Sequence, residues 1–176
     1  MAYDKNYKEY LENINTFIFD VDGVLTDGSL TITASGDMLR TMNVKDGYAL
    51  KQALNKGYNV CIISGGTNEG VRKRLENLGL TDVFLGAQDK LTPFKKYLSN
   101  KNIKSENVLY MGDDIPDIPV MQLIGLATCP QDAVQEVKKV SKYISHKKGG
   151  KGCVRDVIEQ VLKVKNDWNS YFDASI

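Results

Sequence analysis

The chain has 176 residues, of which 42% are hydrophobic and 26% are charged, and its formal net charge is +1. This balance is typical of a globular protein; it argues against disorder, a coiled coil and a broad nucleic-acid-binding surface, and no apolar run approaches the roughly 20 residues that span a bilayer. Three widely spaced cysteines argue against a disulfide framework and a zinc site, and the N-terminus lacks the pattern of a secretion signal. We therefore expect a cytoplasmic protein without membrane or nucleic-acid partners. The length predicts one domain over residues 1–176.

Short apolar segments alternate along the chain with segments in which apolar residues recur every three or four positions. The short segments, which we expect to be strands, are 14–20, 58–63, 82–85, 107–111 and 125–128. The periodic segments, which we expect to be helices, are 47–56, 68–78, 90–100, 118–124, 132–140 and 154–164. Because continuous apolar strands are buried on both faces, this alternation predicts an α/β fold with a mostly parallel sheet.

Two segments depart from the alternation. Residues 29–43 contain two extended arms around Ala34–Asp37, which is typical of a β-hairpin. Residues 165–176 are polar, and we expect an irregular C-terminal tail there. The tail carries three aromatic side chains, Trp168, Tyr171 and Phe172.

The sequence DVDGVLT follows the first expected strand and supplies two carboxylates, Asp20 and Asp22. Residues two apart on an extended chain face the same side, and open α/β sheets bind ligands at the carboxyl ends of their strands. Two close carboxylates repel each other unless a cation or a proton lies between them. An oxygen-rich site of this kind suits Mg²⁺, although the pair alone is also compatible with a simple turn built on Asp22 and Gly23.

Three further strand ends carry polar groups suited to a phosphate site. Ser64-Gly65-Gly66-Thr67 follows the second strand and offers a hydroxyl and successive backbone N–H groups. Lys90 opens the helix after the third strand and offers a fixed positive charge. A second acidic cluster follows the fourth strand and consists of Asp113, Asp114 and Asp117.

The four motifs DVDGVLT, ISGG, Lys90 and GDDIPD, in that order, resemble those of the haloacid dehalogenase-like phosphatase superfamily. The resemblance spans residues 14–156. Within the superfamily, the stretches NVKDGYALK, GDDIPDIPVM and GGKGCVRDV resemble the cap-less branch that hydrolyses 3-deoxy-D-manno-octulosonate 8-phosphate in lipopolysaccharide precursor synthesis. The resemblance implies a Rossmann-like three-layer sandwich without a cap domain, and Mg²⁺ as the cofactor.

The resemblance also implies the catalytic residues, which are Asp20, Asp22, Ser64 and Lys90. Asp20 would attack the phosphorus and form an aspartyl-phosphate. Asp22 would protonate the leaving alkoxide and then deprotonate the hydrolytic water. Ser64 and Lys90 would hold the transferring phosphoryl oxygens.

The metal site is implied in the same way. Mg²⁺ would be held by the side chains of Asp20 and Asp113 and by the main-chain carbonyl of Asp22. Asp114 or Asp117 would orient these ligands, and the sequence leaves open which of the two does so.

The substrate that the resemblance implies is a small keto-deoxy sugar acid phosphate. Its candidate binding residues are Asn43, Lys45, Asp46, Gly47, Lys51, Gly65, Gly66, Arg74 and Lys151. Gly66 departs from the branch, because some members carry an arginine there that would meet the sugar-acid carboxylate. A nine-carbon keto-deoxy sugar acid 9-phosphate therefore stays open as an alternative substrate.

The intervals between the motifs leave no room for a cap domain, so an isolated subunit would have an open site. The branch implies a homotetramer in which the hairpin 29–43 and a neighbour's tail, residues 165–176, close the pocket.

Three other interpretations stay open. The first is a receiver-like signalling module that accepts a phosphoryl group, which the order of the motifs disfavours. The second is a non-catalytic oligomerisation domain, which the intact catalytic residues disfavour. The third is a cap-less phosphatase for protein or polynucleotide substrates.

Overall fold

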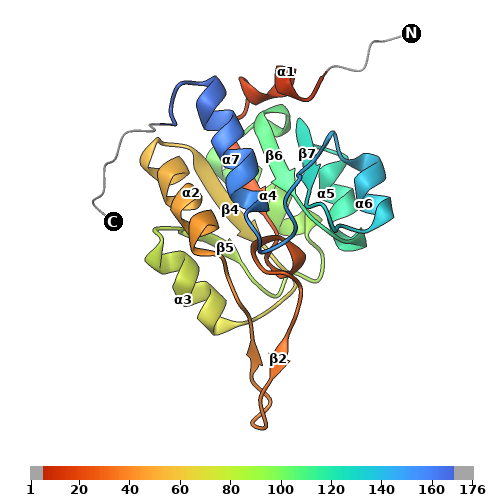
Figure 1. Ribbon diagram of the computed structural model, residues 1–176. Helices are drawn as coiled ribbons and strands as arrows, with labels where there is room; N and C mark the ends of the chain where they lie inside the picture. Colours follow the sequence, from red (N-terminus) through yellow and green to blue (C-terminus); the bar gives the residue numbers. More distant parts are fainter. Residues whose placement is uncertain (1–5, 169–176) are drawn as a thin grey trace.

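Parallel strands form the centre of the molecule, as Figure 1 shows for the computed structural model, which describes residues 6–168. Six strands form one sheet in the order β5-β4-β1-β6-β7-β8, and every neighbouring pair is parallel. Their bounds are β1 Thr16–Phe19, β4 Asn59–Ile63, β5 Asp82–Phe84, β6 Val108–Met111, β7 Leu126–Cys129 and β8 Tyr143–Ile144. The strand order reverses between β1 and β6, which is where ligands bind in sheets of this kind.

Helices cover both faces of the sheet and make a three-layer sandwich (Figure 1). Their bounds are α1 Lys8–Leu11, α2 Val44–Asn55, α3 Glu69–Asn77, α4 Leu91–Lys101, α5 Ile118–Met121, α6 Gln135–Val140 and α7 Cys153–Val164. One hydrophobic cluster joins the sheet to α2, α3 and α7, and a second joins it to α4, α5 and α6. This architecture confirms the expected fold class.

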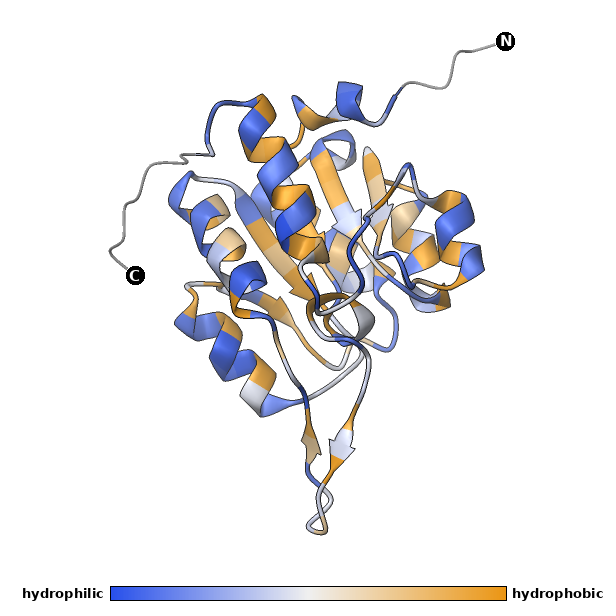
Figure 2. Ribbon diagram, viewed as in Figure 1, coloured by the Kyte–Doolittle hydropathy of each residue, from blue (hydrophilic) through white to orange (hydrophobic). Residues whose placement is uncertain are grey.

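The apolar character of the strands follows from burial on both faces. In β1, Phe17 and Phe19 pack on the side of α2 and α7, whereas Ile18 between them packs on the side of α4. All three side chains are fully buried. Figure 2 shows the same pattern, with hydrophobic strands between helices whose outer faces are hydrophilic.

The expected hairpin projects from the end of the molecule at which β1 finishes (Figure 1). Its strands are β2 Thr31–Ile32 and β3 Met38–Leu39, paired antiparallel. The turn between them uses Gly36 with φ +88°, a left-handed conformation that glycine adopts without strain. Most of the hairpin is solvent-exposed, and its large apolar side chains have no covering element within the described part of the chain.

Other expected elements are found with ends shifted by a few residues. Several short elements were not expected, among them the 3₁₀ turns at Ser105–Asn107 and Ile115–Asp117. The chain after β1 forms a tight turn over Val21–Leu25, and α1 and β8 are additional. β8 pairs through only two residues with β7, so it is too short to show a periodic pattern. The helix expected at 132–140 begins at Gln135, because Val134 is extended.

The tail begins after α7. Trp168 packs edge-on against Tyr48 of the same chain, with ring centroids 6.1 Å apart. Tyr171 and Phe172 lie outside the described residues. Among residues 6–168, the helices are all too short or too polar to cross a bilayer.

Candidate active site

The carboxyl ends of β1, β4 and β6 meet at one cavity of about 410 Å³. Asp20 follows β1, Ser64 follows β4 and Asp113 lies two residues after β6. Lys90, directly before α4, completes the wall. The cavity lies beside the reversal of strand order, so the topology of the sheet brings together four residues that are distant in the sequence.

A buried ion-pair network forms the floor of this cavity. The Nζ atom of Lys90 lies 2.7 Å from Oδ2 of Asp20 and 2.7 Å from Oδ1 of Asp117. The three side chains are 6%, 9% and 0% exposed, so water screens these charges little. Burial alone lowers the pKa of Lys90, but the two carboxylates outweigh that effect and raise it, which keeps the ammonium charged.

Asp117 is the acidic residue that the local structure fixes most tightly. The hydroxyl of Tyr110 donates to its Oδ1 at 2.6 Å, and the backbone N–H groups of Asp113 and Asp114 donate to its Oδ2 at 3.2 and 3.3 Å. Asp114 is exposed, and its own carboxylate accepts the N–H of Ile115 at 2.8 Å. Of the two candidates that the sequence left open, Asp117 is the one that lies in the carboxylate cluster.

Three carboxylates form a site that fits a divalent cation. One oxygen from each of Asp20, Asp113 and Asp117 lies within 4.8 Å of the others. Burial, reinforced by Asp117, raises the pKa of Asp20 to about 6 despite the opposing charge of Lys90. Burial, followed by the charges of Asp20 and Asp117, raises the pKa of Asp113 to about 7. Since one lysine cannot balance three carboxylates, a hard cation such as Mg²⁺ would complete the site.

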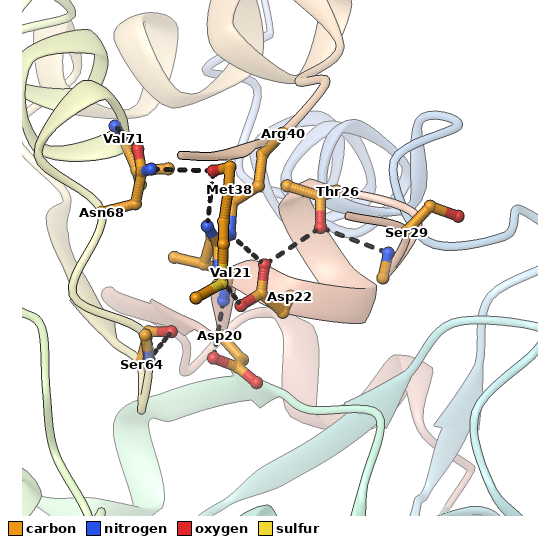
Figure 3. Close-up of polar contacts among 12 residues, drawn as sticks. Asp20, Val21, Asp22, Thr26, Ser29, Met38, Arg40, Ser64, Asn68 and Val71 are labelled. Atoms are coloured by element: carbon orange, nitrogen blue, oxygen red, sulfur yellow. Dashed lines mark hydrogen bonds and ion pairs between the residues drawn. The ribbon is translucent and has the colours of Figure 1, made fainter. Parts of the chain in front are cut away.

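Asp22 lines the cavity, and its side chain points toward Arg40 and away from the carboxylate of Asp20 (Figure 3). Both of its oxygens are held by Arg40: Nε lies 2.7 Å from Oδ1 and Nη2 lies 3.0 Å from Oδ2. Thr26 Oγ1 donates to Oδ1 at the longer distance of 3.5 Å. The side chain of Asp22 is therefore not one of the three carboxylates of the cluster.

Arg40 is a functional-site residue that the sequence analysis missed. It follows β3 at the base of the hairpin, and its side chain is only 8% exposed. No motif surrounds it, and 18 residues separate it from Asp22. The bend of the hairpin is what brings the two together, and periodicity does not predict that bend.

The segment Ser64–Thr67 lies against the pair formed by Asp22 and Arg40. The Oγ atom of Ser64 lines the cavity and accepts the backbone N–H of Gly66 at 3.3 Å. A Cβ atom at Gly66 would lie 3.2 Å from Oδ2 of Asp22 and 3.3 Å from Nη2 of Arg40. Gly65 and Gly66 both line the cavity, so these two substrate candidates lie where the sequence places them.

The other substrate candidates do not line the catalytic cavity of their own chain. Asn43, Lys45 and Lys151 line a second cavity. The glycine-rich segment before α7 nevertheless contacts the first motif, because Gly150 N–H donates to the carbonyl of Val24 at 2.9 Å.

The remaining candidates lie on or beside α2. Gly47 faces Arg74 of α3, whose Nη2 would lie 2.8 Å from a Cβ at that position. Asp46 is buried and accepts the backbone N–H of Arg155 at 2.7 Å, and Lys51 is half-buried. The structure therefore brings the expected catalytic residues to one cavity and leaves these substrate candidates elsewhere on the subunit.

Comparison with known proteins gives consistent similarities. Residues 82–158 match the haloacid dehalogenase-like hydrolase family. The chain is 39% identical over 151 residues to the 3-deoxy-D-manno-octulosonate 8-phosphate phosphatase of Salmonella typhi, an alignment that covers 86% of this chain and 80% of that protein. The enzyme of the same name from Yersinia pestis has a crystal structure that matches with a TM-score of 0.90 at 32% identity, covering 93% of this chain and 88% of that one.

A third similar structure contains ligands. It is the 3-deoxy-D-manno-octulosonate 8-phosphate phosphatase of Moraxella catarrhalis in complex with a magnesium ion, a phosphate ion and a KDO molecule. It matches with a TM-score of 0.88 at 31% identity, and the alignment covers 92% of each chain.

Proposed function

We propose that this chain, which belongs to the haloacid dehalogenase-like hydrolase family and is a phosphatase, hydrolyses 3-deoxy-D-manno-octulosonate 8-phosphate to the free sugar acid and phosphate. The observation that carries the proposal is the cavity in which Asp20, Lys90 and Asp113 meet in a chain so similar to phosphatases of that name. The sugar acid then serves lipopolysaccharide precursor synthesis. The three buried, unpaired cysteines support a reducing compartment, the cytoplasm.

The reaction proceeds in two displacements at phosphorus. In the first, a carboxylate oxygen of Asp20 forms a bond to phosphorus, the bond to the sugar oxygen breaks, and Asp22 gives that oxygen its proton. In the second, Asp22 takes a proton from a water molecule, whose oxygen attacks phosphorus and releases phosphate and the Asp20 carboxylate. Asp20 is suited to this role because its Oδ1 is fixed by the backbone N–H of Val21 at 2.6 Å.

Positive charge must offset the approach of a carboxylate to a phosphate dianion. Lys90 supplies part of it from a fixed position 2.7 Å from the nucleophile. Mg²⁺, held by Asp20, Asp113 and the main-chain carbonyl of Asp22, supplies Lewis-acid stabilisation of the phosphoryl oxygens when bound. Asp117 orients Lys90, and the hydroxyl of Ser64 with the N–H groups of the glycines after it binds the phosphoryl oxygens.

A homotetramer closes the catalytic cavity, which is open in a single subunit. The hairpin supports this part of the proposal, because it extends beyond the body of the subunit (Figure 2) and its large apolar residues are exposed to solvent. These are Leu30, Ile32, Met38 and Leu39, which are 43%, 69%, 49% and 53% exposed. Exposed apolar groups of this kind mark association surfaces. The basic candidates Lys51 and Arg74 then face a neighbour's substrate. The C-terminal tail, residues 165–176, would reach a neighbouring cavity, although residues 169–176 lie outside the described part of the chain.

The sugar specificity is tested by comparing kcat/KM for the eight-carbon acid 8-phosphate and the nine-carbon acid 9-phosphate in the presence of Mg²⁺. We expect the eight-carbon compound to be preferred. Gly66 lacks a side chain beside the Asp22–Arg40 pair, so the variant Gly66→Arg serves as the matched comparison for this position. A clear preference of the parent enzyme for the nine-carbon compound would assign the chain to the alternative activity.

A further inference from the structure

A second cavity of about 540 Å³ lies beside the N-terminal end of α2 and along α7 as far as Lys163. Asn43, the residue before α2, and Gly152, the residue before α7, both line it. Each helix has 12 residues, and a side chain of this chain already caps the first turn of each: Asn43 accepts the N–H of Lys45 in α2, and Asp46 accepts the N–H of Arg155 in α7. Among the residues that the structure describes, none lines both this cavity and the catalytic one.

Basic side chains dominate the walls of the second cavity. They are Lys45, Lys147, Lys151, Arg155 and Lys163, against two carboxylates, Asp156 and Glu159. Both carboxylates are already engaged. Glu159 lies 3.1 Å from Arg155 and 2.7 Å from Lys163, and Asp156 accepts hydrogen bonds from Tyr143 at 2.8 Å and Ser145 at 2.7 Å.

The surplus positive charge is therefore available to a ligand. Within residues 6–168, Lys45 and Lys147 form no ion pair, and Lys151 has only the exposed Asp27, at 3.3 Å. Buried Asp46 already accepts the backbone N–H of Arg155, so a ligand would be held by side chains rather than by the backbone of α7. Several lysines and an arginine around one hollow are the groups that bind phosphate and carboxylate.

We propose that this cavity binds a small oxyanion, a phosphate- or carboxylate-bearing metabolite, at a site separate from the catalytic cavity. Lys151 and Gly152, which line the cavity, lie between two residues that contact the loop after β1. Gly150 N–H and Cys153 Sγ both contact the carbonyl of Val24, at 2.9 and 3.2 Å, and Lys151 pairs with Asp27 just beyond the first motif. An anion that draws Lys151 away from Asp27 alters these contacts and changes turnover.

Trp168 provides a reporter for the second cavity. It is the only tryptophan of the chain, and the guanidinium carbon of Arg155, which lines the cavity, lies 5.4 Å from its ring centroid. Inorganic phosphate and free 3-deoxy-D-manno-octulosonate are titrated separately at constant ionic strength, by tryptophan fluorescence and by calorimetry. The Asp20→Asn variant is used so that no turnover takes place.

We expect a saturable fluorescence change with at least one of the two probes, and the probe that produces it identifies whether phosphate or carboxylate is recognised. The double variant Lys147→Gln/Lys163→Gln should weaken this binding about tenfold or more, because two charged contacts are lost. The control Lys56→Gln/Lys96→Gln removes the same charge from exposed positions outside the cavity and should leave the affinity unchanged.

Two results would overturn the proposal. One is a calorimetric titration with neither probe binding outside the catalytic cavity, together with unchanged fluorescence. The other is an equal loss of affinity in the cavity variant and in the control, since that would reduce the effect to the net charge of the protein.

Discussion

Lys90 is the residue on which the charge balance of the catalytic cavity depends. It contacts Asp20 and Asp117 at 2.7 Å in a nearly dry environment, where an unpaired charge is costly. Replacing it leaves the phosphoryl group and the nucleophile without a fixed positive charge between them.

We predict that Lys90→Ala lowers kcat by about 10²- to 10³-fold or more, because an electrostatic contact to the transferring group is lost. Lys95→Ala, at an exposed position of α4, the helix that Lys90 precedes, should retain activity. Steady-state kinetics of both variants at saturating Mg²⁺ makes the comparison. Comparable losses in the two variants would mean that the charge of the whole helix, rather than the buried contact, matters.

The contact between Arg40 and Asp22 leads to a second prediction. Its guanidinium holds both oxygens of Asp22, so Arg40→Ala should free the Asp22 side chain and lower kcat about 10- to 100-fold. Arg40→Lys keeps the charge without the two-pronged contact and should fall between parent and Arg40→Ala.

A double-variant cycle decides whether Arg40 acts through Asp22. On an Asp22→Asn background, Arg40→Ala should cause no further loss of kcat, because the residue that it positions has already been disabled. An additive loss would show that Arg40 contributes independently of Asp22.

The sequence predicts where the candidate catalytic residues lie better than it predicts their partners. Asp20, Ser64 and Asp113 follow apolar segments whose period identifies them as strands, and parallel strands end at a common edge. Arg40 lies outside every motif, and only the path of the hairpin brings it to Asp22. The choice of Asp117 over Asp114 depends on the hydroxyl of Tyr110, a contact between side chains that no spacing rule predicts.

At the scale of elements, Asp46 joins two helices. It lies in the first turn of α2 and accepts the backbone N–H of Arg155 in the first turn of α7. Burial raises its pKa to about 6, although the backbone N–H groups that it accepts oppose this shift. One of its oxygens, Oδ2, is buried and has no hydrogen-bond partner among residues 6–168.

The raised pKa has a consequence for stability. Below pH 4 the Asp46 carboxyl is protonated in both the folded and the unfolded chain. As the pH rises toward 6, the unfolded chain ionises first, so the contribution of the neutral carboxyl to stability is lost. Asp46→Asn should therefore be more stable than the parent at pH 8, by up to about 3 kcal/mol, and equally stable near pH 4. Urea unfolding across this pH range measures the difference, with the exposed Glu76→Gln as control; a constant difference would contradict the account.

The apolar spacing of the sequence predicts the long helices but not the shortest strand. α2 and α7 have 12 residues each and were expected from their apolar spacing, within three residues at either end. β8 has two residues and gives no such signal. The basic cavity beside α2 and along α7 depends on the packing of elements that are about a hundred residues apart in sequence, so their charges do not form a recognisable run.

At the scale of the whole molecule, the hairpin determines how subunits associate in the proposed tetramer. Ile32→Asp places a charge on its most exposed large apolar residue, which is 69% exposed, and should lower the molecular mass in solution. The kcat/KM should fall about tenfold or more in parallel, because the neighbour no longer covers the cavity and orients the substrate. Leu123→Asp, on another exposed apolar position, should change neither quantity. Analytical ultracentrifugation with kinetics tests this; a monomeric variant with full activity would contradict the proposed closure.

The central claim is that Asp20 is the nucleophile of a Mg²⁺-dependent phosphatase for the eight-carbon sugar acid phosphate. Its most direct test is phosphate release from 3-deoxy-D-manno-octulosonate 8-phosphate by the parent chain and by Asp20→Asn, each with Mg²⁺ and with EDTA. We predict release by the parent only when Mg²⁺ is present, and a loss of about 10⁴-fold or more in Asp20→Asn. Release at the parental rate by Asp20→Asn, or by the parent in EDTA, would contradict the claim.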